Sequence, residues 1–229
     1  MSQIRVPDGL QRFGAGRSEP RHRHGGAYAA LVLEGGYEEC GLHGRIRAEC
    51  GDVLFHNAFE AHGDAFGRMG AAILNLPLPS ATRTAFARCR DAEAILRCAH
   101  RDPREAASRL LETAYPVPLS PRDWPDLLVA DLWADDARSL SDWAGSHGLS
   151  AETLSRGLRR AYGVTPAVLR REIRAQKAWT TIVQEPDPLA AIAADLGFCD
   201  QAHMSREVAR LTGSPPGEWR RQRVCARTH

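Results

Sequence analysis

The fold of the C-terminal part of the chain is decided by one stretch, LGFCDQAHMSREVARLTGSPPGEWR at residues 196–220. Gly197 closes a short helical pattern, Asp200 is a helix N-cap, and Gly213 closes the helix that Asp200 begins. Between these two residues, apolar side chains recur at helical spacing on one side and polar side chains on the other. The stretch predicts two helices joined by a glycine-containing turn, which is the helix-turn-helix pattern.

The same unit occurs a second time, fifty residues earlier in the chain. Residues 144–171 and 194–221 share eight identities over 28 positions, where average residue usage gives about two. The identical pairs are Ala144 with Ala194, Ser155 with Ser205, Arg156 with Arg206, Arg160 with Arg210, Gly163 with Gly213, Pro166 with Pro216, Arg170 with Arg220 and Arg171 with Arg221. Each copy has a polar, Arg-bearing outer face, and a helix with such a face fits the major groove of B-DNA.

Formal charge is distributed unevenly along the chain. Residues 1–137 carry 16 Lys and Arg against 19 Asp and Glu, whereas residues 138–229 carry 14 against 9. The two parts therefore have net charges of −3 and +5, which give the total of +2. A basic C-terminal part favours a polyanionic partner, and solvated arginines on helix surfaces are the other interpretation.

The quoted stretch resembles the signature of the AraC/XylS transcription regulators at Gly197-Phe198, His203, Ser205-Arg206, Gly213 and the segment 214–220. The resemblance implies two helix-turn-helix units that are joined by a long helix and bind double-stranded DNA; a helical bundle of the adaptor type is the alternative. The positions that contact DNA in the family are Ser155 and Arg156 in the first unit and Gln201, Ala202, His203, Ser205 and Arg206 in the second, of which Ala202 cannot hydrogen-bond a base. Arg159, on the outward polar face of the first unit, is a further candidate for DNA contact. Arg170 and Arg220 are expected to contact phosphates.

The first 79 residues are expected to form β-structure. Short apolar and β-branched runs alternate with glycine turns, and helical spacing does not occur between them. The expected strands are residues 28–33, 37–40, 45–48, 53–55 and 71–76, with turns at 34–36 and 51–52 and a loop before residue 71. Strands at this spacing predict a small antiparallel barrel or sandwich, so the fold class is α+β.

Residues 80–122 are expected to connect the two parts through helices that separate near Asp102-Pro103. An apolar stripe at helical spacing predicts either self-association as a homodimer or packing on the barrel; it comprises Phe86, Cys89, Ile95, Leu96, Leu110 and Leu111. Three prolines make residues 115–121 a linker. Residues 123–229 are then the DNA-binding domain, with helix N-caps expected at Ser139, Ser150, Thr165, Asp187 and Asp200.

Histidines in the N-terminal part suggest the input of a sensor. The run Arg21-His22-Arg23-His24 resembles the first cupin motif, with Tyr28 at its glutamate position. Gly51 and His62 resemble the second motif, and His56 is a further candidate. His22 and His24 alternate along a strand and point to one face, where His62 can complete a three-nitrogen site. Zinc, nickel or iron suits such a site, and an acidic small-molecule effector or ordinary barrel histidines are the alternatives. His43 and His100 are expected at the surface.

A DNA-binding transcription regulator with a cupin-like sensor at residues 1–79 is the function that the sequence favours. The alternative is a metal-dependent cupin enzyme with a helical appendage, in which Glu34 or Glu60 supplies the acid or base. Neither a long apolar segment nor a signal-peptide core is visible, and the six cysteines form no C-x-x-C pair, so a cytoplasmic protein is expected. An activator would also contact RNA polymerase.

Overall fold

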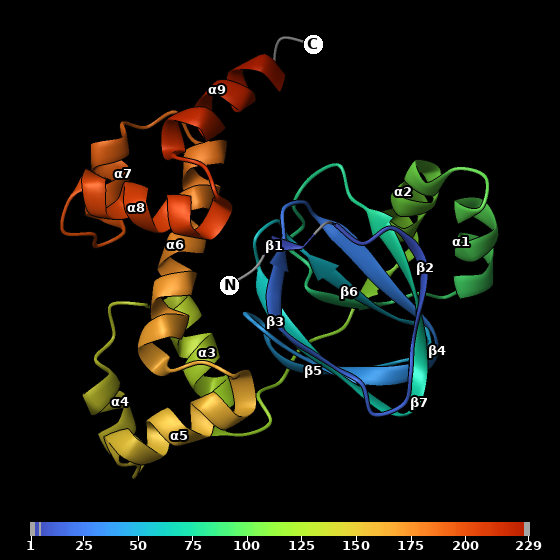
Figure 1. Ribbon diagram of the computed structural model, residues 1–229, viewed down its shortest axis with the longest axis horizontal. Helices are drawn as coiled ribbons and strands as arrows, with labels where there is room; N and C mark the ends of the chain where they lie inside the picture. Colours follow the sequence, from blue (N-terminus) through green and yellow to red (C-terminus); the bar gives the residue numbers. More distant parts are fainter. Residues whose placement is uncertain (1–2, 5, 227–229) are drawn as a thin grey trace. The chain divides into compact units, whose positions relative to one another are not determined.

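The computed structural model describes residues 3–4 and 6–226, and the side chains of residues 6–222. The chain divides into two compact units. The first comprises Met1–Ala130 with Ala161–Gly163, and the second comprises Asp131–Arg160 with Val164–His229. A sheet dominates the first unit and helices make up the second, which confirms the α+β class (Figure 1).

The sheet of the first unit is antiparallel except for one short pairing. Its strands are β1 (Gln3–Ile4), β2 (Gly9–Phe13), β3 (Ser18–His24), β4 (Tyr28–Gly41), β5 (Gly44–Glu49), β6 (Asp52–His56), β7 (Ala61–Pro77), β8 (Phe86–Arg88) and β9 (Tyr115–Pro116). The order is β1-β3-β7-β4-β6-β8-β9, with β2 also paired to β7 and β5 to β4. Only the β1–β3 pair is parallel among these described strands. The path has two open ends, so the expectation of a closed barrel is wrong.

The strands β4 and β7 are longer than the sequence pattern predicted. The turn expected at residues 34–36 is instead an irregularity within β4, and the loop expected before residue 71 is largely the first part of β7. Gly35 has a φ of +68°, and a Cβ there would lie 2.1 Å from the Gly70 carbonyl oxygen. Glycine therefore permits the close approach of two strands here, which sequence patterns do not distinguish from a turn.

Helices α1 (Ala92–Ala99) and α2 (Pro103–Thr113) pack on the sheet. Asp91 and Asp102 cap them, and Pro103 opens α2. Much of the predicted apolar stripe lies in one core with Leu74 and Leu76 of the sheet, namely Cys89, Ile95 and Leu110 with Leu96 at its edge.

Two details of the connecting region differ from the sequence prediction. Phe86 and Cys89 do not lie on a helix, because residues 86–88 pair with β6 as β8. The linker also begins with a strand, since Tyr115–Pro116 pairs with β8 as β9. Helical spacing over a short stretch does not exclude an edge strand, which explains both differences.

The second unit contains the two predicted helical repeats. Its helices, with α3 shared between the units, are α3 (Trp124–Ala134), α4 (Leu140–Ser146), α5 (Ala151–Tyr162), α6 (Pro166–Gln184), α7 (Leu189–Asp195), α8 (Gln201–Thr212) and α9 (Pro216–Ala226). Helices α5 and α8 begin fifty residues apart, as do α6 and α9. The left-handed glycines Gly163 and Gly213 end α5 and α8.

Helix caps explain where these elements begin. Ser139, Thr165 and Asp200 accept the expected backbone N–H bonds, and Ser150 accepts from Thr153. The cap predicted at Asp187 is wrong, because α7 begins one residue later, with Pro188 at the cap and no side-chain bond. Helix α6 is the 19-residue connection, and its Ile182 packs with Ile192 of α7 and Met204 of α8. Within the described part of the chain, none of the helices combines the length and the apolar character needed to cross a membrane.

Candidate DNA interface and effector pocket

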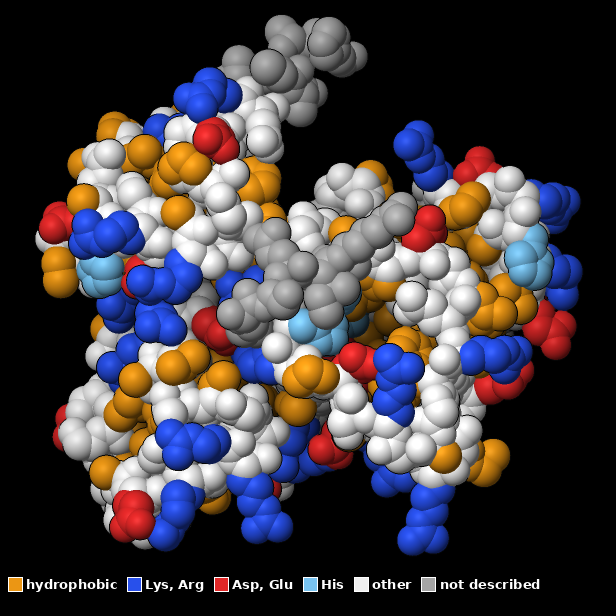
Figure 2. Space-filling model, viewed as in Figure 1, with side chains coloured by type: hydrophobic (Ala, Val, Ile, Leu, Met, Phe, Trp, Pro, Cys, Tyr) orange, Lys and Arg blue, Asp and Glu red, His pale blue; other side chains and the backbone are white. Residues whose placement is uncertain are grey.

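Helices α5 and α8 present equivalent faces. Each buries an apolar side, with Leu154 and Leu158 in α5 and Met204 and Val208 in α8. The residues predicted to contact DNA lie on the other side: Arg156, Arg159, Gln201 and Arg206 are exposed, and Ser155, His203 and Ser205 are half-buried. Lys and Arg side chains are spread over the visible surface of the helical unit (Figure 2). The structure therefore leaves both polar faces accessible to a ligand.

Two of these side chains, those of Arg156 and His203, contact a neighbouring side chain of the protein. Arg156 forms an exposed ion pair with Glu152, whose oxygen lies 2.7 Å from the guanidinium nitrogen. Such a pair contributes only about 0.3–0.5 kcal/mol, so Arg156 can exchange it for another anion. The His203 ring contacts Phe198 edge-on at 5.3 Å between centroids.

The two arginines predicted to contact phosphates occupy matching positions. The guanidinium of Arg170 donates to the carbonyl oxygen of Arg138, and that of Arg220 donates to the carbonyl oxygen of Asp187. Each of these carbonyls immediately precedes the cap of the first helix in its repeat. Both arginines thus join the third helix of a repeat to the start of its first helix, a role that the sequence did not indicate.

A cavity of about 600 Å³ lies inside the sheet of the first unit. Its wall includes His22 and His24 of β3, His62 of β7, and His56 of β6. The first three offer ring nitrogens that lie within 4.8 Å of one another, so the structure brings the predicted triad together. His22 and His62 are direct cross-strand partners, which places both side chains on the same face.

Hydrogen bonds orient the imidazoles toward one another. His22 donates from Nδ1 to the Pro20 carbonyl oxygen at 2.9 Å, which leaves its Nε2 as the free ligand nitrogen. That Nε2 lies 3.1 Å from Nε2 of His24. Tyr28, at the position of the missing glutamate, brings its hydroxyl to 3.3 Å from Nε2 of His62. The three imidazoles of His22, His24 and His62 fit a divalent transition metal. The bond that His22 makes through Nδ1 holds its ring so that Nε2 can act as the ligand atom.

Two carboxyl groups in this pocket, the buried Glu39 and the half-buried Asp64, were not found from the sequence. Glu39 of β4 lies 3.4 Å from Nε2 of His56, and with His56 and His62 it forms a second group of potential metal ligands. Asp64 of β7 lines the same cavity. The only sequence pattern that could have indicated them is a polar residue at every second position of a strand. It was missed because residues before 71 were expected to form a loop.

The acids named for an enzyme lie elsewhere. Glu34 is exposed and pairs with Arg12, and neither Glu34 nor Glu60 is among the residues lining the cavity. Glu60 lies 3.5 Å from Nε2 of His43, and His43 is half-buried with 28% of its side chain exposed, so it lies only partly at the surface. His100 is exposed, as predicted.

Burial sets the protonation of the pocket. Loss of solvent lowers the pKa of His56 to about 3 and lowers that of His62 well below its ordinary value, so both rings are neutral. Burial and the nearby Glu19 raise the pKa of Asp64 to about 7. Burial, followed by the charges of Asp64 and Glu60, raises the pKa of Glu39. Neutral imidazoles and crowded carboxyls disfavour an acidic ligand in this cavity.

Comparison with known protein families identifies the C-terminal region. Residues 143–222, which run from α4 into α9, match a family described as "Helix-turn-helix domain". Residues 143–222 are an AraC-type helix-turn-helix domain. The chain is accordingly a DNA-binding transcription regulator, and all nine residues predicted to contact bases or phosphates lie inside the matched region.

Solved structures of AraC-type proteins show partial likeness to the chain. A probable AraC family transcriptional regulator from Rhodopseudomonas palustris is 20% identical and covers 42% of this chain and 93% of its own, with a TM-score of 0.39. A regulator from Chromobacterium violaceum is 26% identical over 42% of this chain and 88% of its own, with a TM-score of 0.40. ToxT from Vibrio cholerae is 9% identical over 93% of this chain and 98% of its own, with a TM-score of 0.44. Curated proteins yielded no match.

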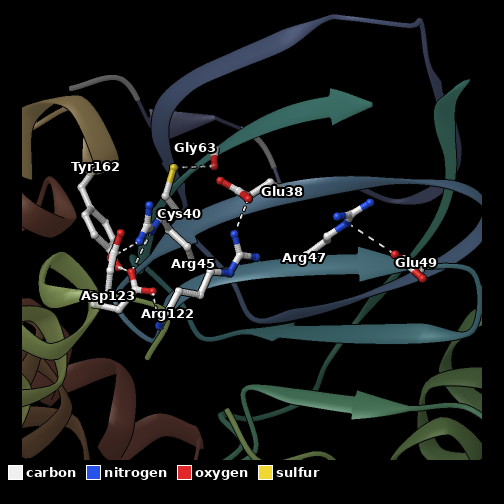
Figure 3. Close-up of polar contacts among 10 residues, drawn as sticks. Glu38, Cys40, Arg45, Arg47, Glu49, Gly63, Arg122, Asp123 and Tyr162 are labelled. Carbon is white, nitrogen blue, oxygen red and sulfur yellow. Dashed lines mark hydrogen bonds and ion pairs between the residues drawn. The ribbon is translucent and has the colours of Figure 1, made fainter. Parts of the chain in front are cut away.

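Within the first unit, a polar cluster joins the β4–β5 hairpin to the start of α3 and to Tyr162 (Figure 3). Asp126 is 3% exposed and accepts from Nε of Arg45 at 2.8 Å, from the backbone N–H of Arg122 at 3.0 Å, and from the Tyr162 hydroxyl. Burial would raise the pKa of Asp126, but bonds from Arg45, Tyr162 and Arg122 outweigh it and lower that pKa. Tyr162 is the last residue of α5 and belongs to the first unit.

Proposed function

We propose that this regulator binds a specific duplex site by placing α5 and α8 in two successive major grooves on one side of the DNA. The observation that supports this most is the repetition of one exposed polar face on two helices that begin fifty residues apart. Helix α8 packs on α6 and α7, and α6 directly follows α5 in the chain, so the one helix α6 connects the two recognition helices. Such a pair has to match grooves about 34 Å apart.

The proposed base contacts come from both recognition helices. They are Ser155, Arg156 and Arg159 of α5 and Gln201, His203, Ser205 and Arg206 of α8. Arginine can donate two bonds to one guanine, and glutamine can bond adenine in the same way, so these residue types provide direct readout. The protein then works in the cytoplasm without catalysing a reaction, and contacts RNA polymerase if it is an activator.

Selection from a random pool of duplex DNA tests this proposal. The full chain at physiological salt should enrich one consensus composed of two half-sites, because each recognition helix covers only a few base pairs. A pool that shows no enrichment after successive rounds would contradict sequence-specific binding.

Arg170 and Arg220 are proposed as phosphate contacts. Each guanidinium uses one nitrogen to bond a backbone carbonyl, and its other N–H groups remain to donate to a phosphate. Replacing either by Ala should weaken binding to all sequences alike and reduce the salt dependence of the affinity by about one counterion. Titration of a selected site at several salt concentrations measures both effects. An unchanged salt slope with a lowered melting temperature would assign the two arginines to the fold alone.

The cavity of the first unit is the proposed input of the regulator. His22, His24 and His62 are the proposed ligands of zinc, nickel or iron, and the bond from His22 Nδ1 to the Pro20 carbonyl supports this assignment. A cupin-like sensor built on these residues could equally hold a small-molecule effector. The enzyme alternative gains no support, because Glu34 pairs with Arg12 and Glu60 with Asn57 and His43.

Metal analysis of untagged protein tests the histidine site. We expect close to one equivalent of metal in the wild type and a loss of at least tenfold in the His22→Ala/His62→Ala variant, because two ligands of three are removed. His100→Ala, which removes an exposed histidine, is the control and should retain the metal. Equal and substoichiometric metal in all three proteins would make the triad ordinary pocket histidines.

A homodimer through the connecting helices stays a prediction. The apolar surface available for it is smaller than the sequence indicated, because Ile95 and Leu110 are buried in the first unit. Leu111 of α2 is the large exposed apolar residue that remains from the predicted stripe.

A further inference from the structure

The inner face of β7 presents three chemically different side chains in succession. His62, Asp64 and Phe66 alternate along the strand and all line the cavity. Residues two apart on a strand are separated by about 7 Å, so each begins a separate layer of the pocket wall. Neighbouring strands continue each layer with residues of the same type.

The middle layer consists of carboxyl groups on three adjacent strands. Asp64 is the direct cross-strand partner of Glu39 on β4 and of Glu19 on β3. Like charges that face each other in this way are destabilising without a counter-ion. Glu19 has one in Arg17, at 2.5 Å, whereas the ring beside Glu39 is that of His56, which is neutral. Oδ1 of Asp64 is buried and has no hydrogen-bond partner within the described part of the chain.

The next layer is aromatic. Tyr37 on β4 is the direct partner of Phe66, and Phe13 on β2 stacks on Phe66 with ring centroids 4.2 Å apart. The guanidinium carbon of Arg17 lies 5.4 Å from the centre of the Phe13 ring. A cation of the chain itself therefore already lies on this aromatic wall, beside the carboxyl layer. Faces of aromatic rings attract cations, so the two layers favour the same sign of charge.

The charge and the size of the cavity both indicate an organic cation. Its wall contains four acidic residues, namely Asp8, Glu19, Glu39 and Asp64, and one arginine, Arg17. A volume of about 600 Å³ lies in the range of pockets that hold small organic molecules and is far larger than one metal ion needs. The imidazole layer suits a metal, but a metal there leaves Oδ1 of Asp64 without a hydrogen-bond partner among the described residues.

We infer that the carboxyl and aromatic layers bind an organic ammonium ion. Its charged nitrogen lies at Asp64, and its apolar or aromatic body lies against Phe13, Tyr37 and Phe66. The effector of this regulator is then an amine, with or without a metal at the imidazole layer. This inference rests on the proposed use of the cavity as the input, and it names the chemistry of what enters.

Calorimetry with three probes of one shape tests the inference on the full wild-type chain. The probes are 2-phenylethylamine, 2-phenylethanol and 3-phenylpropanoate, which carry a positive, no and a negative charge near neutral pH. We expect the amine to bind at least about tenfold more tightly than the alcohol, because a hydrogen bond to a charged group is lost. The acid should not bind. Equal binding of amine and acid, or no binding of the amine at about 10 mM, would overturn the inference.

The variant Asp64→Asn locates the charged nitrogen. The isosteric amide should lower the affinity for 2-phenylethylamine by at least about tenfold and leave that for 2-phenylethanol unchanged. Glu34→Gln is the matched control, because Glu34 also lies on the sheet but is exposed and outside the cavity, and it should bind the amine like the wild type. If the His22→Ala/His62→Ala variant lost amine binding while Asp64→Asn kept it, the ligand would lie on the imidazole layer and the assignment would be refuted. These measurements contain no DNA, so a failure to bind DNA would count against the proposed function alone.

Discussion

We expect Arg206→Ala to lower the affinity of the full chain for its selected DNA site by about 1–3 kcal/mol, or about 5- to 150-fold. Arg206 is exposed on α8, and a guanidinium that donates two bonds to a guanine discriminates against other bases by this amount. Arg156→Ala, the same change in the other repeat, should have the same effect on the other half-site. Each variant should also tolerate more bases at the position that its arginine contacts.

A matched control is available in the first unit. Arg97 is exposed on α1 and pairs with Glu93 four residues earlier, as Arg156 pairs with Glu152. Arg97→Ala therefore removes the same kind of ion pair and one positive charge, and it should leave DNA affinity within about twofold. Wild-type affinity of both Arg156→Ala and Arg206→Ala in electrophoretic titrations would refute the assigned recognition helices.

The second large effect is expected at Asp126. Replacing it by Ala should lower the free energy of unfolding of the first unit by about 3 kcal/mol, because Arg45 loses a buried counter-ion and Tyr162 loses its acceptor. Urea titration followed by tryptophan fluorescence measures the change. The pKa of Asp126 is lowered on folding, so its contribution is present above pH of about 4 and is lost as the pH falls through the lower folded pKa.

Asp123 provides the comparison for this prediction. It is the second carboxylate that binds Arg45, but its side chain is 52% exposed, against 3% for Asp126. Asp123→Ala should therefore cost less than about 1 kcal/mol. Equal effects of the two substitutions would show that burial does not determine the strength of this cluster.

The helical unit could be predicted closely from the sequence because its signals are local. A cap such as Asp200, a left-handed glycine such as Gly213 and apolar residues at helical spacing lie within one helix length of one another. The repeat adds an independent check, since two copies fifty residues apart predict the same three helices. Asp187 shows the limit of such local signals. The helix begins one residue later than predicted, with Pro188 as its N-cap, and the apolar spacing of the helix is the same for both starting points.

The sheet was less predictable because strand pairing joins distant residues. His22, His24 and His62 were found because two alternate along one strand and the third has a motif spacing, and the structure brings the three together. Glu39 and Asp64 were missed, since their importance arises from a cross-strand pairing that no local pattern encodes. The carbonyl bonds of Arg170 and Arg220 were missed for the same reason, as their partners lie more than thirty residues away.

Footprinting of the full chain on its selected DNA fragment tests the central claim most directly. If α5 and α8 read successive major grooves, two protected patches should lie on one face of the duplex, with centres about 34 Å or one helical turn apart. Arg156→Ala should weaken protection of one patch and Arg206→Ala that of the other. A single patch, patches on opposite faces, or equal loss of both patches in each variant would contradict the account.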